Sequence, residues 1–229
     1  MPKKRKFLVI SAHPDDLDFA CGGTMAKLTG EGNEVVELIV SDGSKGSHKV
    51  GFGGRKLAAV REKEERKAAK VLRAKEVHFL KEKDGELENT RALRKKLAAF
   101  MRKVKPDVVL SGEPSYAFEN TYRSHRDHRM AAEAVFDAIY PAVGNASFFP
   151  ELLKKGLKPH QIGELWFWGA TKPDKRVDIS KTMELKIKAL ACHESQIVDM
   201  KGMAERIRER ARETGRGRYV EAFRVLKLS

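Results

Sequence analysis

The chain reads FLVISAHPDD at residues 7–16, and this stretch decides the fold class. Residues 7–11 form a short apolar run of the kind found in buried parallel strands. The polar turn that follows places a histidine, a proline and two aspartates at the carboxyl end of that strand. In sheets of parallel strands, binding and catalytic residues gather at this end. The stretch therefore predicts a buried strand followed by a functional loop.

Strands and helices alternate along the rest of the chain. Such alternation predicts an α/β, Rossmann-like fold with a largely parallel sheet and helices on both faces. No linker or internal repeat interrupts the 229 residues, so we expect a single domain over residues 1–229. We expect strands at 35–40, 76–80, 107–110, 164–170 and 219–228, and helices at about 22–30, 55–73, 88–104, 126–140, 181–193 and 197–213.

The composition is strongly basic, with 46 Lys and Arg against 32 Asp and Glu and a net charge of +14. A nucleic-acid-binding protein and a thermophile-like surface both fit that balance. Aromatic residues make up 7% of the chain and do not alternate with the basic runs, which speaks against a base-stacking surface. The arginines between residues 206 and 218 alternate with glutamates, so we interpret them as a solvated helix face. Nucleic acid is therefore the minor alternative.

The cysteines and the apolar runs bear on the cellular compartment. Cys21 and Cys192 lie far apart, which excludes a disulfide scaffold and a four-cysteine zinc module. No apolar run approaches the roughly 18 residues of a membrane-spanning helix, and the first residues do not resemble a signal peptide. We therefore expect a cytoplasmic protein that has no membrane partner.

Two motifs rich in histidine and aspartate indicate a metal centre. The first presents His13 with Asp15 and Asp16, two carboxylates of which one can bind a metal while the other accepts protons. The second presents His125 and His128 on the predicted inward stripe of the helix at 126–140. Three ligands from the two motifs would leave a position open for water, as in catalytic zinc sites. A strand-ending turn and hydrogen-bonded core histidines are the alternatives, and the spacing alone does not choose between the two histidines of the second motif.

Three further polar residues are candidates for function. Two of them lie on the apolar stripe of a predicted helix, and the third directly follows another helix. Arg61 and Glu64 share the apolar stripe of the helix at 55–73, where burial requires a partner or a function. An ion pair between them is the simpler interpretation, and an Arg61 side chain that points into a substrate pocket is the other. His193 follows a predicted helix, where interaction with the helix dipole explains it.

Taken together, these motifs resemble one family. The segments AHPDDLDFACGGT, RxxE, DG, SHRDH, HESQ and YVEAF occur between residues 12 and 223 in the order typical of the LmbE/PIG-L family of zinc-dependent N-acetylglucosaminyl deacetylases. The resemblance implies an enzyme that removes the N-acetyl group from an N-acetylglucosamine-containing sugar or glycoconjugate, giving acetate and an amino sugar. A metal hydrolase of another N-acyl or ester substrate is the alternative within enzymes.

The resemblance also implies a metal and its ligands. His13, Asp16 and His128 match the zinc ligands of the family, and Fe(II) and Co(II) suit the same donor set. Asp15 matches the general base that takes a proton from water. Leu17 stands where many members carry glutamate, which leaves the metal assignment intact.

Other roles follow from the same resemblance. His125 matches the residue that stabilises the oxyanion or protonates the leaving amine, with Asp127 orienting it. Arg61 and Asp84 stand where the family contacts substrate. His193 resembles a family histidine near the active site, which in some members reaches a neighbouring subunit. We therefore also expect a homo-oligomer.

Overall fold

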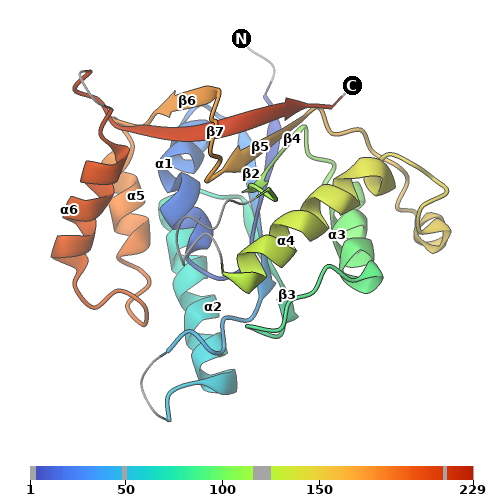
Figure 1. Ribbon diagram of the computed structural model, residues 1–229, viewed down its shortest axis with the longest axis horizontal. Helices are drawn as coiled ribbons and strands as arrows, with labels where there is room; N and C mark the ends of the chain where they lie inside the picture. The colour runs from blue at the N-terminus through green and yellow to red at the C-terminus, as the bar shows by residue number, and fades with distance from the viewer. Residues whose placement is uncertain (1–3, 48–50, 116–124, 214–215, 229) are drawn as a thin grey trace.

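A seven-stranded sheet with the order β3-β2-β1-β4-β5-β7-β6 forms the centre of the protein (Figure 1). This computed structural model describes residues 4–47, 51–115, 125–213 and 216–228. The first five strands run parallel, whereas β7 runs antiparallel to β5 and to β6. The strands are β1 (Lys6–Ser11), β2 (Glu34–Ser41), β3 (Glu76–Glu82), β4 (Val108–Gly112), β5 (Glu164–Trp168), β6 (Lys175–Asp178) and β7 (Val220–Lys227).

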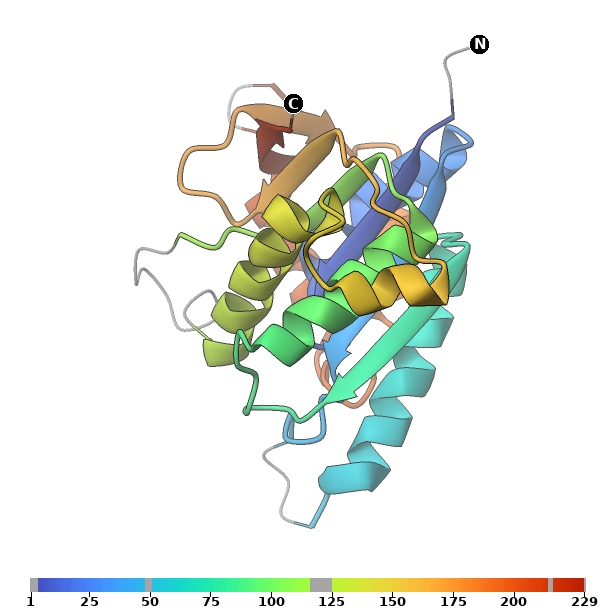
Figure 2. The same ribbon diagram turned by 90° about the vertical axis from the view of Figure 1, so that its right-hand side faces the viewer.

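Helices cover both faces of this sheet. One face carries α1, α2 and α5, and the other carries α3, α4 and η1; Figure 2 shows α3 and α4 in front of the sheet. The predicted α/β fold with helices on both faces of a largely parallel sheet is thus confirmed. The helices are α1 (Asp16–Gly30), α2 (Gly54–Val71), α3 (Arg91–Val104), α4 (Arg126–Asp137), α5 (Met183–Leu190), α6 (Met200–Ala211) and the short helices η1 (Ala138–Val143) and η2 (Pro150–Lys155).

The central strand β1 links the two layers of core. Leu8 and Ile10 pack into the cluster below α3 and α4, whereas Phe7 and Val9 pack into the cluster below α1 and α2. This division follows from the pleat, since successive side chains of a strand point to opposite faces. Helices cover the sheet on both faces, so residues 7–11 of β1 are buried, as the unbroken apolar run predicted.

The order of the strands positions the functional loops. The chain leaves β1 toward β2 on one side, and later reaches β4 on the other side of β1. The carboxyl ends of β1 and β4 therefore lie at a switch point of the sheet, where open α/β folds bind their ligands. The loop that begins with Ala12 and the segment that leads to α4 both start there.

The sequence-based elements differ from the structure in several places, and two of these are in α1 and β6. Helix α1 begins at Asp16 rather than near residue 22, with non-helical dihedrals at Cys21 inside it. The four-residue edge strand β6 was missed, because a short and mostly charged strand carries no apolar pattern.

Gly23 is required in α1, since a Cβ there would lie 2.7 Å from Ile179 Cδ1.

None of the helices in the described part of the chain is both long and apolar enough to span a bilayer. The single domain over residues 1–229 stays a prediction.

Candidate active site

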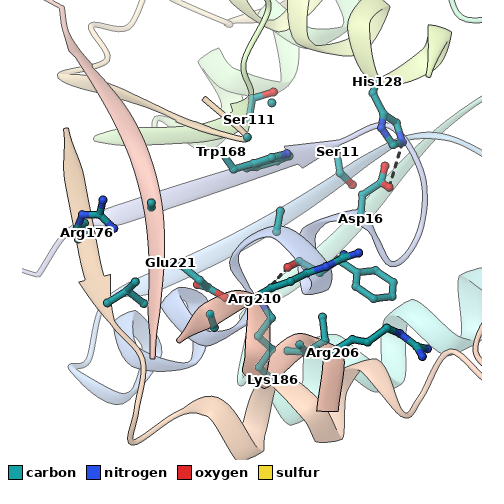
Figure 3. A pocket seen from close by; sticks show the side chains of 18 of the residues that line it. Ser11, Asp16, Ser111, His128, Trp168, Arg176, Lys186, Arg206, Arg210 and Glu221 are labelled. Atoms are coloured by element: carbon teal, nitrogen blue, oxygen red, sulfur yellow. Dashed lines mark hydrogen bonds and ion pairs between the residues drawn. The ribbon is translucent and has the colours of Figure 1, made fainter. Parts of the chain in front are cut away.

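Three side chains from the two motifs place their donor atoms in a small triangle. His13 Nδ1 lies 3.2 Å from His128 Nε2 and 3.4 Å from Asp16 Oδ2, and His128 Nε2 lies 3.2 Å from Asp16 Oδ1. Ligand atoms at about 2.0–2.1 Å from a tetrahedral ion lie about 3.3 Å from one another. The two histidines and the aspartate therefore fit a divalent metal ion, and Figure 3 shows the His128 and Asp16 side chains turned toward each other.

The other ring nitrogen of His13 is held by two carboxylates. Its Nε2 lies 3.1 Å from Asp84 Oδ1 and 3.2 Å from Asp127 Oδ2. These carboxylates are themselves fixed, because the backbone N–H of Lys45 donates to Asp84 and that of Gly85 donates to Asp127. Metal-bound histidines typically donate their second N–H to such a carboxylate, which fixes the orientation of the ring. The resemblance placed Asp84 at the substrate, whereas its side chain contacts His13.

The electrostatics of the triangle favour a cation. Burial acts to lower the pKa of His13, but hydrogen bonds to three carboxylates, that of Asp127 first, hold it well above its ordinary value. Burial acts to raise the pKa of Asp16, but the charge and hydrogen bond of His128, followed by those of His13, hold it well below its ordinary value. The carboxylates of Asp16, Asp84 and Asp127 thus surround the His13 ring, and their negative charge favours a bound cation.

Asp15 lies beside this triangle in a backbone conformation that is uncommon for a residue with a side chain. Its φ is 88° and its ψ is −30°. The backbone N–H of Asp15 donates a hydrogen bond to Glu65 Oε2 at 2.8 Å, which stabilises this conformation. Its Oδ2 lies 3.3 Å from Arg61 Nη2. Burial raises the pKa of Asp15 to about 6, with the Arg61 charge opposing and the Asp16 charge adding to the rise. A carboxylate with such a pKa is suited to accept a proton near neutral pH.

Arg61 does not pair with Glu64, so the predicted ion pair is wrong. Its guanidinium donates to the carbonyls of Pro14 at 2.7 Å and Gly43 at 3.1 Å, and it is 4% exposed. Glu64 instead accepts hydrogen bonds from the N–H and the hydroxyl of Ser195, in the HESQ segment. Arg61 therefore holds together two loops of the site and the Asp15 carboxylate.

His193 follows α5, as predicted, but it is completely buried and its side chain contacts carboxylates, which the helix-dipole interpretation did not include. Its Nε2 lies 2.7 Å from Asp18 Oδ2 and 3.8 Å from Glu65 Oε2. Glu37, on β2, is also completely buried, and the charge of Glu65 raises its pKa in addition to burial. The buried network of Asp18, Glu37, Glu65 and His193 lies directly behind Asp15, through the Glu65 hydrogen bond.

The two histidines of the second motif have different surroundings. His125 is the N-cap of α4, where its Nδ1 accepts from the Asp127 N–H at 3.2 Å, and it is exposed. Its ring centroid lies 5.0 Å from those of His13 and His128. Burial, followed by the charges of those two histidines, lowers the pKa of His125. Both histidines turn toward His13, as predicted, since one ring nitrogen of each and one of His13 all lie within 4.8 Å of one another, although His125 precedes the helix and is exposed. The backbone N–H of Asp127 contacts His125, whereas the Asp127 carboxylate contacts His13.

Sequence reasoning missed three residues of the buried network, namely Asp18, Glu37 and Glu65. Glu65 falls on the apolar stripe of α2 together with Arg61 and Glu64, so the same argument could have singled it out. Glu37 interrupts the apolar run VVELIV in a fully buried strand. A charge in the middle of such a run is the signal that indicates a paired or proton-sharing group. Ser124, the first residue of the SHRDH segment, lies outside the described residues.

The buried network predicts that stability falls as the pH rises. Burial acts to lower the pKa of His193, but the hydrogen bond and charge of Asp18 raise it from 6.5 to about 9. Burial raises the pKa of Glu65 from 4.5 to about 8. Both groups hold protons more tightly in the folded state, so the stabilisation is complete at low pH and is lost as the pH rises through these values. Each group contributes a slope of at most about 1.4 kcal/mol per pH unit.

The measurement is urea unfolding of chelator-treated protein at pH 6.5 and at pH 9, for the wild type and for His193→Gln. The free energy of unfolding of the wild type should fall between these values, and that of the variant should fall less because His193 no longer releases a proton. The same slope in both proteins would exclude His193 from this effect.

Comparisons with known proteins agree with this geometry. The family described as "PIG-L: GlcNAc-PI de-N-acetylase" matches residues 8–139. A diacetylchitobiose deacetylase of Thermococcus kodakarensis is 40% identical over 192 residues, which are 84% of this chain and 70% of that protein. A probable N-acetyl-alpha-D-glucosaminyl L-malate deacetylase 2 of Bacillus anthracis is 26% identical, over 86% of this chain and 83% of that protein.

A solved structure agrees as well. The N,N'-diacetylchitobiose deacetylase from Pyrococcus horikoshii superposes with a TM-score of 0.90 and 34% identity, over 97% of this chain and 84% of that one. The family match spans the first metal motif and the second, and the relatives extend it over most of the chain. The chain therefore belongs to the PIG-L family of de-N-acetylases, as the motifs predicted.

Proposed function

We propose that the protein is a metal-dependent N-deacetylase that removes the acetyl group from an N-acetylglucosamine-containing sugar or glycoconjugate. The products are acetate and an amino sugar. The observation that carries the proposal is the Asp15 carboxylate, with a pKa raised to about 6, beside a triangle of His13, Asp16 and His128 donor atoms. The 40% identity to a diacetylchitobiose deacetylase supports N,N'-diacetylchitobiose as the first substrate to test.

We assign zinc to the triangle, with Fe(II) and Co(II) as the alternatives, because two imidazoles and one carboxylate suit all three ions. When bound, such an ion supplies Lewis acidity, which polarises the acetyl carbonyl and acidifies water. Asp84 and Asp127 hold the His13 ring in place through its Nε2. They act by positioning a ligand rather than by reacting.

The chain's own residues handle the protons. Asp15 accepts the proton of the attacking water at its carboxylate, which Arg61 and the Glu65 hydrogen bond hold in position. His125, at the exposed start of α4, stabilises the negative charge that develops on the acetyl oxygen. The proton that Asp15 has taken from water then passes to the departing amine, which leaves Asp15 ionised again. We propose Arg61 and His193 as positioning residues. Arg61 bonds backbone carbonyls of two loops, and His193 contacts the Asp18 carboxylate, so both support the site through other residues of the chain.

A substrate panel tests this function. Zinc-loaded protein should release acetate and amine in equal amounts from N,N'-diacetylchitobiose, and should release little acetate from an aryl acetate ester. Faster turnover of the ester than of the amide would favour the alternative hydrolase. No acetate from any N-acetylglucosaminide, in protein that holds one metal ion per chain, would contradict the proposal.

A cytoplasmic location and a homo-oligomer remain part of the proposal. The two free cysteines, Cys21 and Cys192, fit a reducing compartment. Cell fractionation and light scattering test these two points directly.

Replacing Arg61 by lysine should lower kcat by about tenfold and the free energy of unfolding by about 1–2 kcal/mol. A lysine ammonium cannot reproduce the planar fork that bonds the Pro14 and Gly43 carbonyls and faces Asp15. Steady-state kinetics and urea unfolding measure the two effects. Arg66→Lys is the matched control, because Arg66 lies on the same helix in an exposed pair with Glu62. A raised KM with unchanged kcat and stability would instead place Arg61 at the substrate.

Replacing Glu65 by leucine should lower kcat by about tenfold or more while the bound metal stays at one ion per chain. The leucine removes the acceptor that fixes the Asp15 N–H, and the left-handed conformation of Asp15 costs about 1–3 kcal/mol to maintain. Glu65→Gln keeps an acceptor oxygen and should retain most of the activity. Equal kcat values for the leucine variant and the wild type would show that Asp15 needs no such support.

A further inference from the structure

The buried network lies beneath the face of the sheet that carries α1, α2 and α5. Asp18 belongs to α1, Glu37 to the middle of β2 and Glu65 to α2, and His193 follows α5. Figure 1 shows these helices together on one side of the sheet. All four side chains have a relative exposure of 0%. Four separate elements of the fold thus bring ionisable groups to one point inside the protein.

Three residues of the network place possible ligand atoms close together. His193 Nε2 lies 2.7 Å from Asp18 Oδ2 and 3.8 Å from Glu65 Oε2, and one donor atom of each residue lies within 4.8 Å of the other two. Ligand atoms of a single ion lie about 3–4 Å apart when each is about 2.0–2.2 Å from the ion. Asp18, Glu65 and His193 therefore offer three donors at nearly this spacing.

The fourth residue, Glu37, is the independent sign of a ligand. Neither of its carboxylate oxygens has a hydrogen-bond partner among the described residues, and the same is true of Asp18 Oδ1 and Glu65 Oε1. Burial, followed by the charges of Glu65 and Asp18, raises the pKa of Glu37, so its carboxylate faces the other two. Buried polar groups are nearly always paired. A fully buried carboxylate with two free oxygens, turned toward two more carboxylates, indicates a cation between them.

The charge of the network agrees with this interpretation. In the part of the chain that the structure describes, His193 is the one group of positive charge within ion-pair distance of the three carboxylates. The nearby Arg61 pairs with Asp15 instead. Buried charges are costly unless they are neutralised. Two additional protons would neutralise the carboxylates but would leave the oxygens of Glu37 without partners, whereas a divalent ion supplies both the charge and the contacts.

The donor set indicates the kind of ion. Three carboxylates and one imidazole make a site richer in oxygen than the triangle, which has two imidazoles and one carboxylate. Carboxylates suit Mg²⁺, Ca²⁺ and Mn²⁺, whereas imidazole suits Fe²⁺ and Zn²⁺. Ions such as Mn²⁺ and Fe²⁺ accept both kinds of ligand, so they fit the network best.

We propose that the buried network is a second metal site, which binds a divalent transition-metal ion of the Mn²⁺ or Fe²⁺ kind. Its ligands are distinct from those of the triangle, and they do not touch substrate. Glu65 also accepts the hydrogen bond of the Asp15 N–H, so the ion fixes the segment that carries the proposed base. The second site goes beyond the proposed function, because it concerns bound metal and stability rather than turnover.

Counting metal ions tests the second site. Chelator-treated protein is loaded with one equivalent of zinc and dialysed against Mn²⁺, and both metals are measured by mass spectrometry. We expect two ions per chain in the wild type, zinc and manganese together. Because the network is fully buried, Mn²⁺ is supplied both to the folded protein and during refolding from urea, so that slow entry does not hide binding.

Glu37→Gln should hold one ion per chain under the same conditions, because the amide removes a charge and weakens the ligand. Glu34→Gln is the matched control and should hold two, since Glu34 lies on the same strand but pairs with Lys6 and Lys75 near the surface. Added Mn²⁺ should raise the melting temperature of the zinc-loaded wild type by a few degrees and leave that of Glu37→Gln unchanged. The melting curve without Mn²⁺ shows that the variant is folded.

Pulsed electron paramagnetic resonance identifies the ligands of the bound Mn²⁺. The spectrum of the zinc-loaded wild type should show coupling to the nitrogen of a single imidazole, and His193→Gln should lose this coupling. Coupling to two imidazoles would place the manganese in the triangle and would contradict the second site.

Two other results would overturn the second site. One is a single ion per chain in the wild type by both routes of loading, which would show that protons or water neutralise the network. The other is a second ion that Glu37→Gln retains. Acetate release together with either result would leave the deacetylase function standing. Two ions per chain without acetate release would support the second site and contradict the function.

Discussion

His128→Ala should purify with little bound metal and release no acetate, whereas His125→Ala should keep its metal and lose most of its turnover. His128 Nε2 lies 3.2 Å from both His13 Nδ1 and Asp16 Oδ1. Its removal leaves two protein donors, and two donors bind zinc far more weakly than three. The melting temperature of this variant should also fall, because bound metal stabilises the folded state.

His125 is expected to act on the reaction rather than on the metal. Its Nδ1 already accepts the Asp127 N–H, and its ring lies at the exposed start of α4. Loss of an oxyanion-stabilising donor lowers kcat by about 10²- to 10³-fold. Metal analysis by mass spectrometry and acetate release on the same preparations separate the two histidines. A metal-poor His125→Ala would reverse the assignments, and stoichiometric metal in both variants would place the third ligand elsewhere.

Asp15→Asn should retain one metal ion per chain and lose at least about 10²-fold in kcat, the usual contribution of a positioned base. The amide keeps the size of the side chain and its place beside Arg61, but it cannot accept the proton of water. Asp16→Asn is the matched comparison, because Asp16 Oδ2 lies 3.4 Å from His13 Nδ1 and its loss should lower the metal content as well. A metal-replete Asp15→Asn with wild-type turnover would exclude Asp15 as the base.

Much of the fold and the position of the site could be predicted from the sequence. The apolar run at residues 7–11 predicted the central strand because a strand buried on both faces consists mostly of apolar residues. The first metal motif follows that strand directly, and the second follows β4, so the parallel order of the strands brings them to one edge. The sequence thus placed the two motifs at one edge of the sheet, and the resemblance to the family chose His128 over His125 as the third ligand.

The supporting contacts could not be predicted, because they join residues that are distant in sequence. His193 meets Asp18 across 175 positions, and no periodicity links the two. The Arg61–Glu64 pair illustrates the opposite error, since proximity along a helix suggested a partner that the fold does not use. Arg61 instead bonds the carbonyls of two loops, and loop carbonyls have no signature in a sequence.

Arg206 and Arg210 of α6 are exposed, as expected of a solvated helix face, but the partner of Arg208 was not predicted. The glutamates between the arginines predicted local pairing at i,i+3. In the structure Arg208 pairs with Glu184 of a different helix, and Arg206 and Arg210 line a pocket that Asp16 and His128 also line. Which face of an amphipathic, charged helix meets a cavity depends on tertiary packing, so it follows only from the structure.

The most direct test of a metal-dependent deacetylase is a zinc titration of chelator-treated protein in the presence of N,N'-diacetylchitobiose. Bound zinc and released acetate are measured on the same samples. We expect no acetate release without metal, and a linear rise in rate that levels at one equivalent per chain as the triangle of His13, Asp16 and His128 fills. Full acetate release from metal-free protein, or one bound equivalent without any acetate release, would contradict the account.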